Sequence, residues 1–124
     1  MPFLNVQIMQ GHSASQKTAL LKAASRAVAE SLAAPETSVR IVLQEVPAEH
    51  VIVAGEIGKR MARVDVDMIE GRDEAKKAAL MAALNQAVCS TVDMSGDEVR
   101  VVIRDVPKVD MGVANGISAK AAGR

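Results

Sequence analysis

The feature that most constrains the fold of this chain is an internal repeat. When the sequence is aligned with itself at a shift of 60 residues, glycines, apolar residues and Val-Pro pairs coincide without a gap. The matches include Gly11 with Gly71, Lys17 with Lys77, Leu20 with Leu80, Ala27-Val28 with Ala87-Val88, Val39-Arg40 with Val99-Arg100, Val46-Pro47 with Val106-Pro107 and Ile57 with Ile117. Two repeats are too few for a solenoid, which usually needs three or more. The sequence therefore predicts two units, residues 1–60 and 61–124, fused in one pseudo-symmetric domain.

Each unit has the pattern of a strand followed by a helix. Apolar and polar residues alternate over residues 4–8 and again over 64–68, which predicts a half-buried strand at the start of each unit. Ser13 with Gln16 forms a capping-box pattern, and Asp73 is a candidate N-cap in the second unit. Apolar residues then recur every four positions, so we expect each helix to cover a sheet. These residues are Leu20, Ala24, Val28 and Leu32 in the first unit and Leu80, Leu84, Val88 and Val92 in the second.

A second strand follows each helix. Residues 39–46 and 99–106 are rich in β-branched residues, and we expect them in the buried middle of the sheet. A strand, a helix and a strand in this order form a crossover unit with parallel strands. The predicted fold class is α/β (α+β): two tandem β-α-β units form a four-stranded sheet with two helices on one face. Residues 55–63 read as a hairpin-like link between the units.

The second face of this sheet should be apolar. We expect Val42, Val102 and their neighbours to lie there, and an exposed apolar surface of that size favours self-association.

Composition excludes several function classes. Fifteen basic residues balance fifteen acidic ones, which argues against nucleic acid and membrane partners. Phe3 is the only aromatic residue, so base stacking is not expected. A single cysteine, Cys89, and the absence of a signal-peptide pattern favour a cytoplasmic location. The two histidines and Cys89 lack metal-ligand spacing, and we predict neither a metal nor a cofactor.

Pro2 has two interpretations. It is either an ordinary residue at the edge of a strand or, after removal of Met1, an N-terminal secondary amine. An amine with a pKa near neutrality can act as a general base.

The residues around Pro2 resemble those of a known family. Met1-Pro2, a strand ending at Gly11, a helix, the stretch 33–40 and the Val-Pro turn are similar in order to 4-oxalocrotonate tautomerase, of the tautomerase superfamily. The resemblance covers nearly the whole chain, once per unit. It implies an isomerase that interconverts enol and keto forms of a small 2-oxo acid, and a fused chain that replaces a dimer and assembles as a homotrimer.

The resemblance also implies roles for individual residues. Pro2 would be the general base and acid, while its counterpart Ala62 has no free amine, so a trimer should hold three active sites. Arg40 and Arg100 would bind the oxo and carboxylate groups of the substrate. The family's other arginine is His12 in the first unit and Arg72 in the second, so we expect Arg72 to serve Pro2 from across the pseudo-dyad. Val51 and Met111 occupy the positions of the family's aromatic residue and would line the substrate site.

Two alternative functions stay open. Related members of the superfamily use the same proline for dehalogenation of 3-haloacrylates or decarboxylation of malonate semialdehyde. Those dehalogenases use two arginines spaced three apart, whereas Ile69 precedes Arg72 at that spacing here. The chain could also be a non-catalytic trimer that retains Met1.

Overall fold

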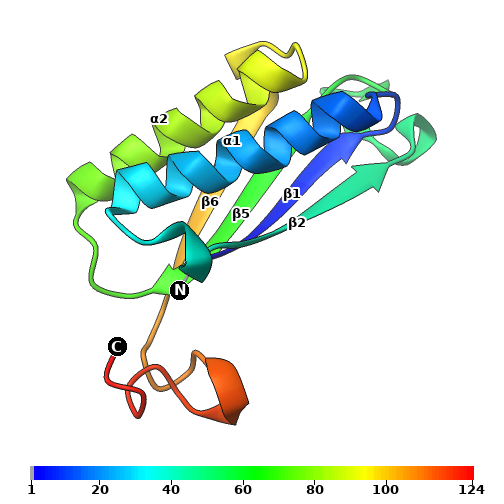
Figure 1. Ribbon diagram of the computed structural model, residues 1–124. Coiled ribbons are helices and arrows are strands. Elements are labelled where there is room, and N and C mark those ends of the chain that lie inside the picture. The colour runs from blue at the N-terminus through cyan, green and yellow to red at the C-terminus, as the bar shows by residue number, and fades with distance from the viewer. Residues whose placement is uncertain (1) are drawn as a thin grey trace.

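The computed structural model describes residues 2–124, and the predicted removal of Met1 lies outside the described residues. Two helices lie side by side over one face of a four-stranded sheet (Figure 1). The elements in chain order are β1 (Phe3–Met9), α1 (Ala14–Leu32), β2 (Arg40–Val46), β3 (Ile52–Val53), β4 (Glu56–Ile57), β5 (Ala62–Ile69), α2 (Glu74–Thr91) and β6 (Val99–Val106). Among these residues no helix has the length and hydropathy needed to cross a membrane.

The sheet has the order β2-β1-β5-β6. Strands β1 and β2 are parallel, as are β5 and β6, which confirms the predicted β-α-β units. The two central strands pair antiparallel, with Phe3 opposite Asp67 and Ile8 opposite Ala62. The start of each unit therefore lies beside the end of the other unit's first strand. This antiparallel pairing gives the sheet two pseudo-equivalent ends.

The second strand of each unit lies at an edge of the sheet, so the prediction that these strands fill its middle was wrong. The reason lies in how their side chains alternate. Ile41 and Leu43 of β2, and Val101 and Ile103 of β6, pack against the core beneath the helices. Neighbouring residues on the same strands face away from the helices. β-branched residues therefore stabilise these edge strands through one face only.

The helix predictions are confirmed. The side chain of Ser13 accepts a hydrogen bond from the backbone N–H of Gln16 at 3.2 Å, and the side chain of Gln16 accepts one from the N–H of Ser13 at 2.9 Å. Asp73 caps α2 by accepting from the N–H of Lys76 at 2.9 Å. These bonds satisfy amide groups that the first turn of each helix leaves without partners.

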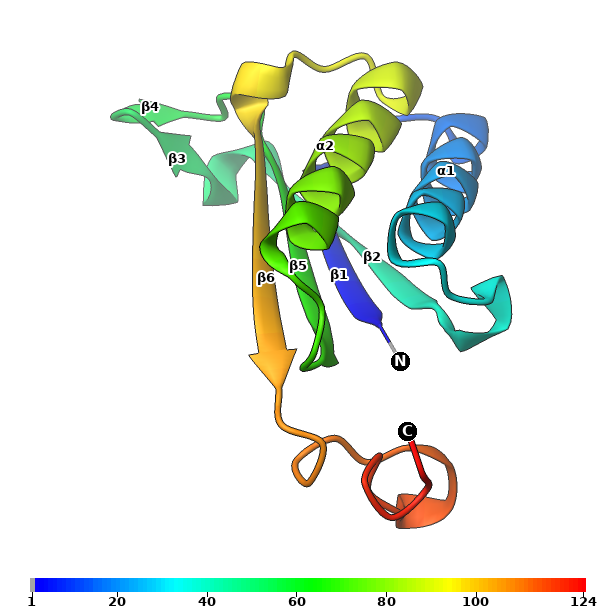
Figure 2. The ribbon, with the colours of Figure 1, turned by 90° about the vertical axis from the view of Figure 1, so that its left-hand side faces the viewer.

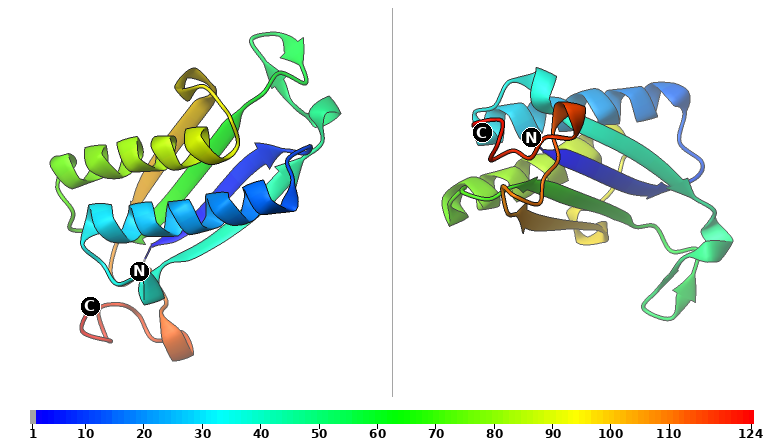
Figure 3. Two further views of the ribbon diagram at one scale, coloured as in Figure 1. Left: turned by 45° about the horizontal axis from the view of Figure 1, so that its top comes forward. Right: turned by 90° about the horizontal axis from the view of Figure 1, so that it is seen from below.

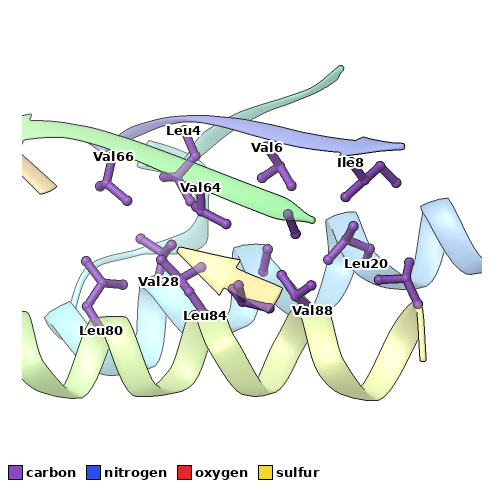
Figure 4. Packing of buried hydrophobic residues seen from close by; sticks show 14 of the residues in the cluster. Leu4, Val6, Ile8, Leu20, Val28, Val64, Val66, Leu80, Leu84 and Val88 are labelled. Atoms are coloured by element: carbon purple, nitrogen blue, oxygen red, sulfur yellow. The ribbon is translucent and has the colours of Figure 1, made fainter. Parts of the chain in front are cut away.

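The core lies between the helices and the sheet (Figure 4). Leucine and valine side chains from α1 and α2 meet those of β1 and β5, which point down from the sheet. The predicted helix stripe is buried at all eight positions: Leu20, Ala24, Val28, Leu32, Leu80, Leu84, Val88 and Val92.

The opposite face of the sheet is only partly apolar, which corrects the expectation of an apolar surface. Phe3 is 43% exposed and Val42 is 51% exposed, while Val102 is half-buried. Polar residues of the same strands lie among them, because every second residue of a strand points to this face.

Hydrogen bonds between neighbouring strands organise these polar residues. Gln7 donates to Gln44 at 3.1 Å between β1 and β2. The Nε of Arg104 on β6 donates to a carboxylate oxygen of Asp67 on β5 at 2.8 Å. The hydrogen bond to Asp67 and its negative charge raise the pKa of Arg104. This face thus carries specific polar pairs beside its exposed apolar residues.

Two appendages extend from opposite ends of the sheet. The β3–β4 hairpin projects near the start of β5 and covers residues 52–57, so it begins three residues before the predicted link of 55–63, whose last two residues belong to β5 (Figure 2). Residues 107–124 leave the end of β6 and form a compact segment with a bridge between Gly112 and Ser118. This segment lies near the start of β1, away from the hairpin (Figure 3).

Candidate active site

Pro2 is buried immediately before β1. Its carbonyl accepts a hydrogen bond from the backbone N–H of Arg40 at 3.1 Å, which ties it to the start of β2. Because Phe3 pairs with Asp67, the same antiparallel register continued by one residue brings Pro2 beside Met68. Pro2 therefore lies between the beginning of β2 and the end of β5.

Arg72 follows the end of β5 and lies at this same end of the sheet. Gly71 turns the chain there with φ of +123°, a conformation that favours glycine. The guanidinium Nη1 of Arg72 then donates to the carbonyl of Ile69 at 3.2 Å, so the half-buried side chain folds back over the strand end. The topology thus brings a cation of the second unit to the end of the sheet that holds Pro2.

His12 lies at the other end. It follows the corresponding turn at Gly11, with φ of +119°, after β1 has passed the start of β5. Ile8 pairs with Ala62, so His12 belongs to the end at which Ala62 takes the place of Pro2. Within one chain the antiparallel centre of the sheet therefore associates Arg72, and not His12, with Pro2.

Arg40 and Arg100 also lie at opposite ends of the sheet. Arg40 begins β2 and pairs with Phe3 at the Pro2 end. Arg100 lies near the start of β6 and pairs with Arg63 at the Ala62 end. Both side chains are exposed.

Val51 and Met111 also lie at different ends. Val51 is buried at the base of the β3–β4 hairpin, and its carbonyl accepts from the N–H of Gly58 at 2.8 Å. Met111 is half-buried in the C-terminal segment, and its carbonyl accepts from the N–H of Ala119 at 2.8 Å. Of the two residues, Met111 is the one on the side of Pro2.

The predicted site residues thus form two sets. The Pro2 end holds Pro2, Arg40, Arg72 and Met111, and the Ala62 end holds Ala62, Arg100, His12 and Val51. The first set combines a buried proline with two guanidinium groups, which are suited to binding a carboxylate. Among residues 2–124, no three His, Cys, Asp or Glu side chains gather as a metal site would require.

A pocket at the Ala62 end was not foreseen from the sequence. It has a volume of about 770 Å³ and is lined by residues 59–63, including Met61 and Ala62, together with Arg100. The basic pair Lys59-Arg60 lies in the segment that the sequence predicts only to be a hairpin-like link, and this pair by itself does not indicate a pocket.

Comparison with known proteins identifies the family. The model of the family described as "Tautomerase enzyme" matches residues 2–60 and 63–120. A 2-hydroxymuconate tautomerase of Stutzerimonas stutzeri is 40% identical over 63 residues, which cover 51% of this chain and 100% of that relative.

Solved structures match over nearly the full chain. A fused 4-OT described as a wild-type symmetric trimer is 62% identical, with a TM-score of 0.96, over 98% of this chain and 99% of that one. The structure of Pt0534 inactivated by 2-oxo-3-pentynoate is 43% identical, with a TM-score of 0.96 and the same coverage. Because the family model matches both repeats and fused proteins match the whole fold, the chain belongs to the tautomerase family, as a 4-oxalocrotonate tautomerase-like isomerase.

Proposed function

We propose that this protein interconverts the enol and keto forms of a small 2-oxo acid, with a 2-hydroxydienoic acid as its substrate. The observation that supports the proposal is the antiparallel pairing of β1 with β5, because it brings Arg72 of the second unit to the same end of the sheet as the buried Pro2. The name of the Stutzerimonas relative, a 2-hydroxymuconate tautomerase, supports the substrate class.

In the proposed mechanism, Pro2 is the general base and acid. In this proposal, removal of Met1 leaves a secondary amine, and the positive charges of Arg40 and Arg72 at the same end of the sheet favour its neutral form, which can accept a proton. The amine takes the proton of the 2-hydroxyl group, and the electron pair moves into the conjugated chain. The Pro2 ammonium then returns a proton to a carbon of that chain, so the reaction is an isomerisation with no net change in atoms. General acid–base catalysis of this kind contributes about 10² to 10⁴-fold.

The arginines bind the charges of the substrate and of the intermediate. The intermediate carries negative charge on the oxo oxygen, which a guanidinium group can stabilise through a fork of N–H donors. We assign Arg72 to a carboxylate and Arg40 to the oxo end, because both lie at the Pro2 end. Met111 of the C-terminal segment lies at the same end and would contact the apolar part of the substrate. Arg100 and Val51 lie at the Ala62 end, and we assign them no part at Pro2 within one chain.

We further propose that the chain functions as a homotrimer, with its sheets inward and its helices outward. Exposed Phe3 and Val42 supply apolar contacts on the open face of the sheet. The fused 4-OT with the same fold is described as a symmetric trimer. Sedimentation at micromolar concentration should give three times the chain mass of 13.0 kDa. A single species with the mass of one chain would overturn this assembly.

A substrate comparison tests the proposed activity. Protein made without an N-terminal tag is first analysed by intact mass, to establish that Met1 has been removed. It is then assayed with 2-hydroxymuconate, phenylenolpyruvate and 3-haloacrylates. Ketonisation without halide release supports the tautomerase assignment. Halide release alone would replace it with a dehalogenase, and processed protein that turns over none of these compounds would refute the proposed substrate class.

A further inference from the structure

The end of the sheet without Pro2 carries a pocket that the proposed reaction does not use. We call it the Ala62 pocket. Its walls come from the β3–β4 turn, residues 59–63 at the start of β5, the turn before β6 and the start of β6, and its volume is about 770 Å³. That volume lies within the range of about 300 to 1,000 Å³ that is usual for small-molecule sites.

Basic side chains outnumber acidic ones on the walls of the Ala62 pocket. The basic residues are Lys59, Arg60, Arg63 and Arg100, and the acidic ones are Asp97 and Glu98. At neutral pH this leaves a formal excess of positive charge, which favours an anionic ligand. The exposed carboxylate of Asp97 works against this preference but does not cancel it.

Arg60 and Arg63 are already paired with acidic residues. The Nε of Arg60 lies 3.4 Å from a carboxylate oxygen of Glu98, and the Nε of Arg63 donates to Asp65 at 3.1 Å. These two arginines therefore shape the pocket more than they attract a ligand.

Arg100 is different, because its hydrogen bonds leave its charge uncompensated. Its Nη1 donates to the backbone carbonyls of Asp97 at 2.9 Å and Val99 at 3.0 Å. Carbonyls orient the guanidinium without neutralising it, and its remaining N–H groups are suited to a carboxylate. Among the described residues, neither Arg100 nor Lys59 takes part in an ion pair of 4.0 Å or less.

The rest of the lining suits a carbon skeleton. Val53, Ala54, Met61 and Val102 contribute apolar surface, and Ala62 stands where the first unit has Pro2. The nitrogen of Ala62 is a mid-chain amide, which cannot accept a proton as an amine would. The Ala62 pocket therefore combines a cation and an apolar wall with no amine base at Ala62.

From this combination we propose that the Ala62 pocket is a second ligand site, which binds a small organic carboxylate through Arg100 and Lys59 without converting it. The occupant is an anion with a short unsaturated or aliphatic body. Within one chain this site is separate from the proposed reaction at Pro2, since the two lie at opposite ends of the sheet.

Methyl NMR can observe the two ends independently. Protein labelled at the methionine methyl groups is titrated with cis,cis-muconate, a dicarboxylate that lacks the 2-hydroxyl group needed for ketonisation. Met61 lines the Ala62 pocket and reports on it, and Met111, in the segment that follows the end of β6, reports on the Pro2 end. The proposal predicts a saturable shift of the Met61 methyl signal.

Variants then identify the groups that hold the anion. Arg100→Ala should weaken binding at Met61 about tenfold or more, and Lys59→Gln, an exposed and structurally mild change, should also weaken it. Arg40→Ala is the matched control at the other end and should leave the Met61 titration unchanged. A Met61 signal that does not respond to cis,cis-muconate would overturn the second site. So would wild-type affinity for cis,cis-muconate in both the Arg100→Ala and the Lys59→Gln variants. If Met111 responds while Met61 does not, this proposal fails and the one for Pro2 is unaffected.

Discussion

Separate alanine substitutions of Arg72 and His12 test which unit serves Pro2. The two residues follow equivalent glycine turns, but the antiparallel centre of the sheet places them at opposite ends. Arg72 follows the end of β5, beside the start of β1, whereas His12 follows the end of β1, at the end of the sheet that holds Ala62. If Pro2 is the base, only Arg72→Ala should impair the reaction strongly.

The size of the effect follows from the contact that is lost. A hydrogen bond to a charged group contributes about 1.5 to 3 kcal/mol, which corresponds to a decrease in kcat/KM of about 13- to 160-fold. Arg72 also donates to the carbonyl of Ile69, and loss of this bond costs about 0.5 to 1.5 kcal/mol of stability. His12→Ala should change kcat/KM by less than about threefold, or about 0.7 kcal/mol.

The assay is ketonisation of 2-hydroxymuconate by processed protein, with thermal unfolding of each variant as the control for folding. We expect Arg72→Ala to raise KM. Arg72→Lys, which keeps the charge but loses the planar fork, should fall between the alanine variant and wild type. If His12→Ala loses activity while Arg72→Ala resembles wild type, the assignment across the pseudo-dyad is wrong and Pro2 is served by its own unit.

Three further predictions concern stability and processing. Leu84→Ala removes a fully buried side chain and should lower the free energy of unfolding by about 2 to 5 kcal/mol in chemical denaturation. Met81→Ala, at a position that is 41% exposed, should lower it much less. Equal losses in the two variants would contradict the placement of Leu84 in the core. Ser13→Ala breaks the capping box of α1 and should cost about 0.5 to 2 kcal/mol by the same measurement, and an unchanged midpoint would show that the cap contributes nothing. Pro2→Ala keeps a primary amine and should retain a remnant of tautomerase activity, while protein that retains Met1 should have none; activity in the Met1 form would exclude the amine mechanism.

The helices and their buried faces were predictable from the sequence because they depend on local spacing. Leu20 and Leu80 begin apolar stripes whose period matches an α-helix, and the caps at Ser13 and Asp73 lie three residues from their partners. The two units were also predictable, because aligning the sequence with itself at a fixed shift needs no knowledge of contacts between distant residues.

The order of the strands was harder to predict. The β-branched residues of β2 and β6 suit a central or an edge position, because strand preference reflects packing on one face more than the place in a sheet. Pairing of Asp67 with Arg104 was also missed, since their contact depends on the register between β5 and β6, 37 residues apart in sequence.

The candidate site was only partly visible from the sequence. Pro2, Arg72 and His12 stood out through the resemblance to a family, and their division between two ends follows from the antiparallel central pair. By contrast, the Ala62 pocket is assembled from four separate segments, none of which carries a recognisable motif. Such a pocket becomes apparent only when the chain has folded.

Covalent labelling by 2-oxo-3-pentynoate tests the central claim, that Pro2 carries the reactive amine, most directly. The structure of the related Pt0534 is described as inactivated by this compound. Processed protein is treated with it until tautomerase activity is lost, and peptides are then analysed by mass spectrometry. The account predicts one added molecule per chain, bonded to the peptide that begins with Pro2, and no such label in protein that retains Met1. Loss of activity with the label on Lys59, Cys89 or any other residue, and Pro2 unmodified, would contradict it.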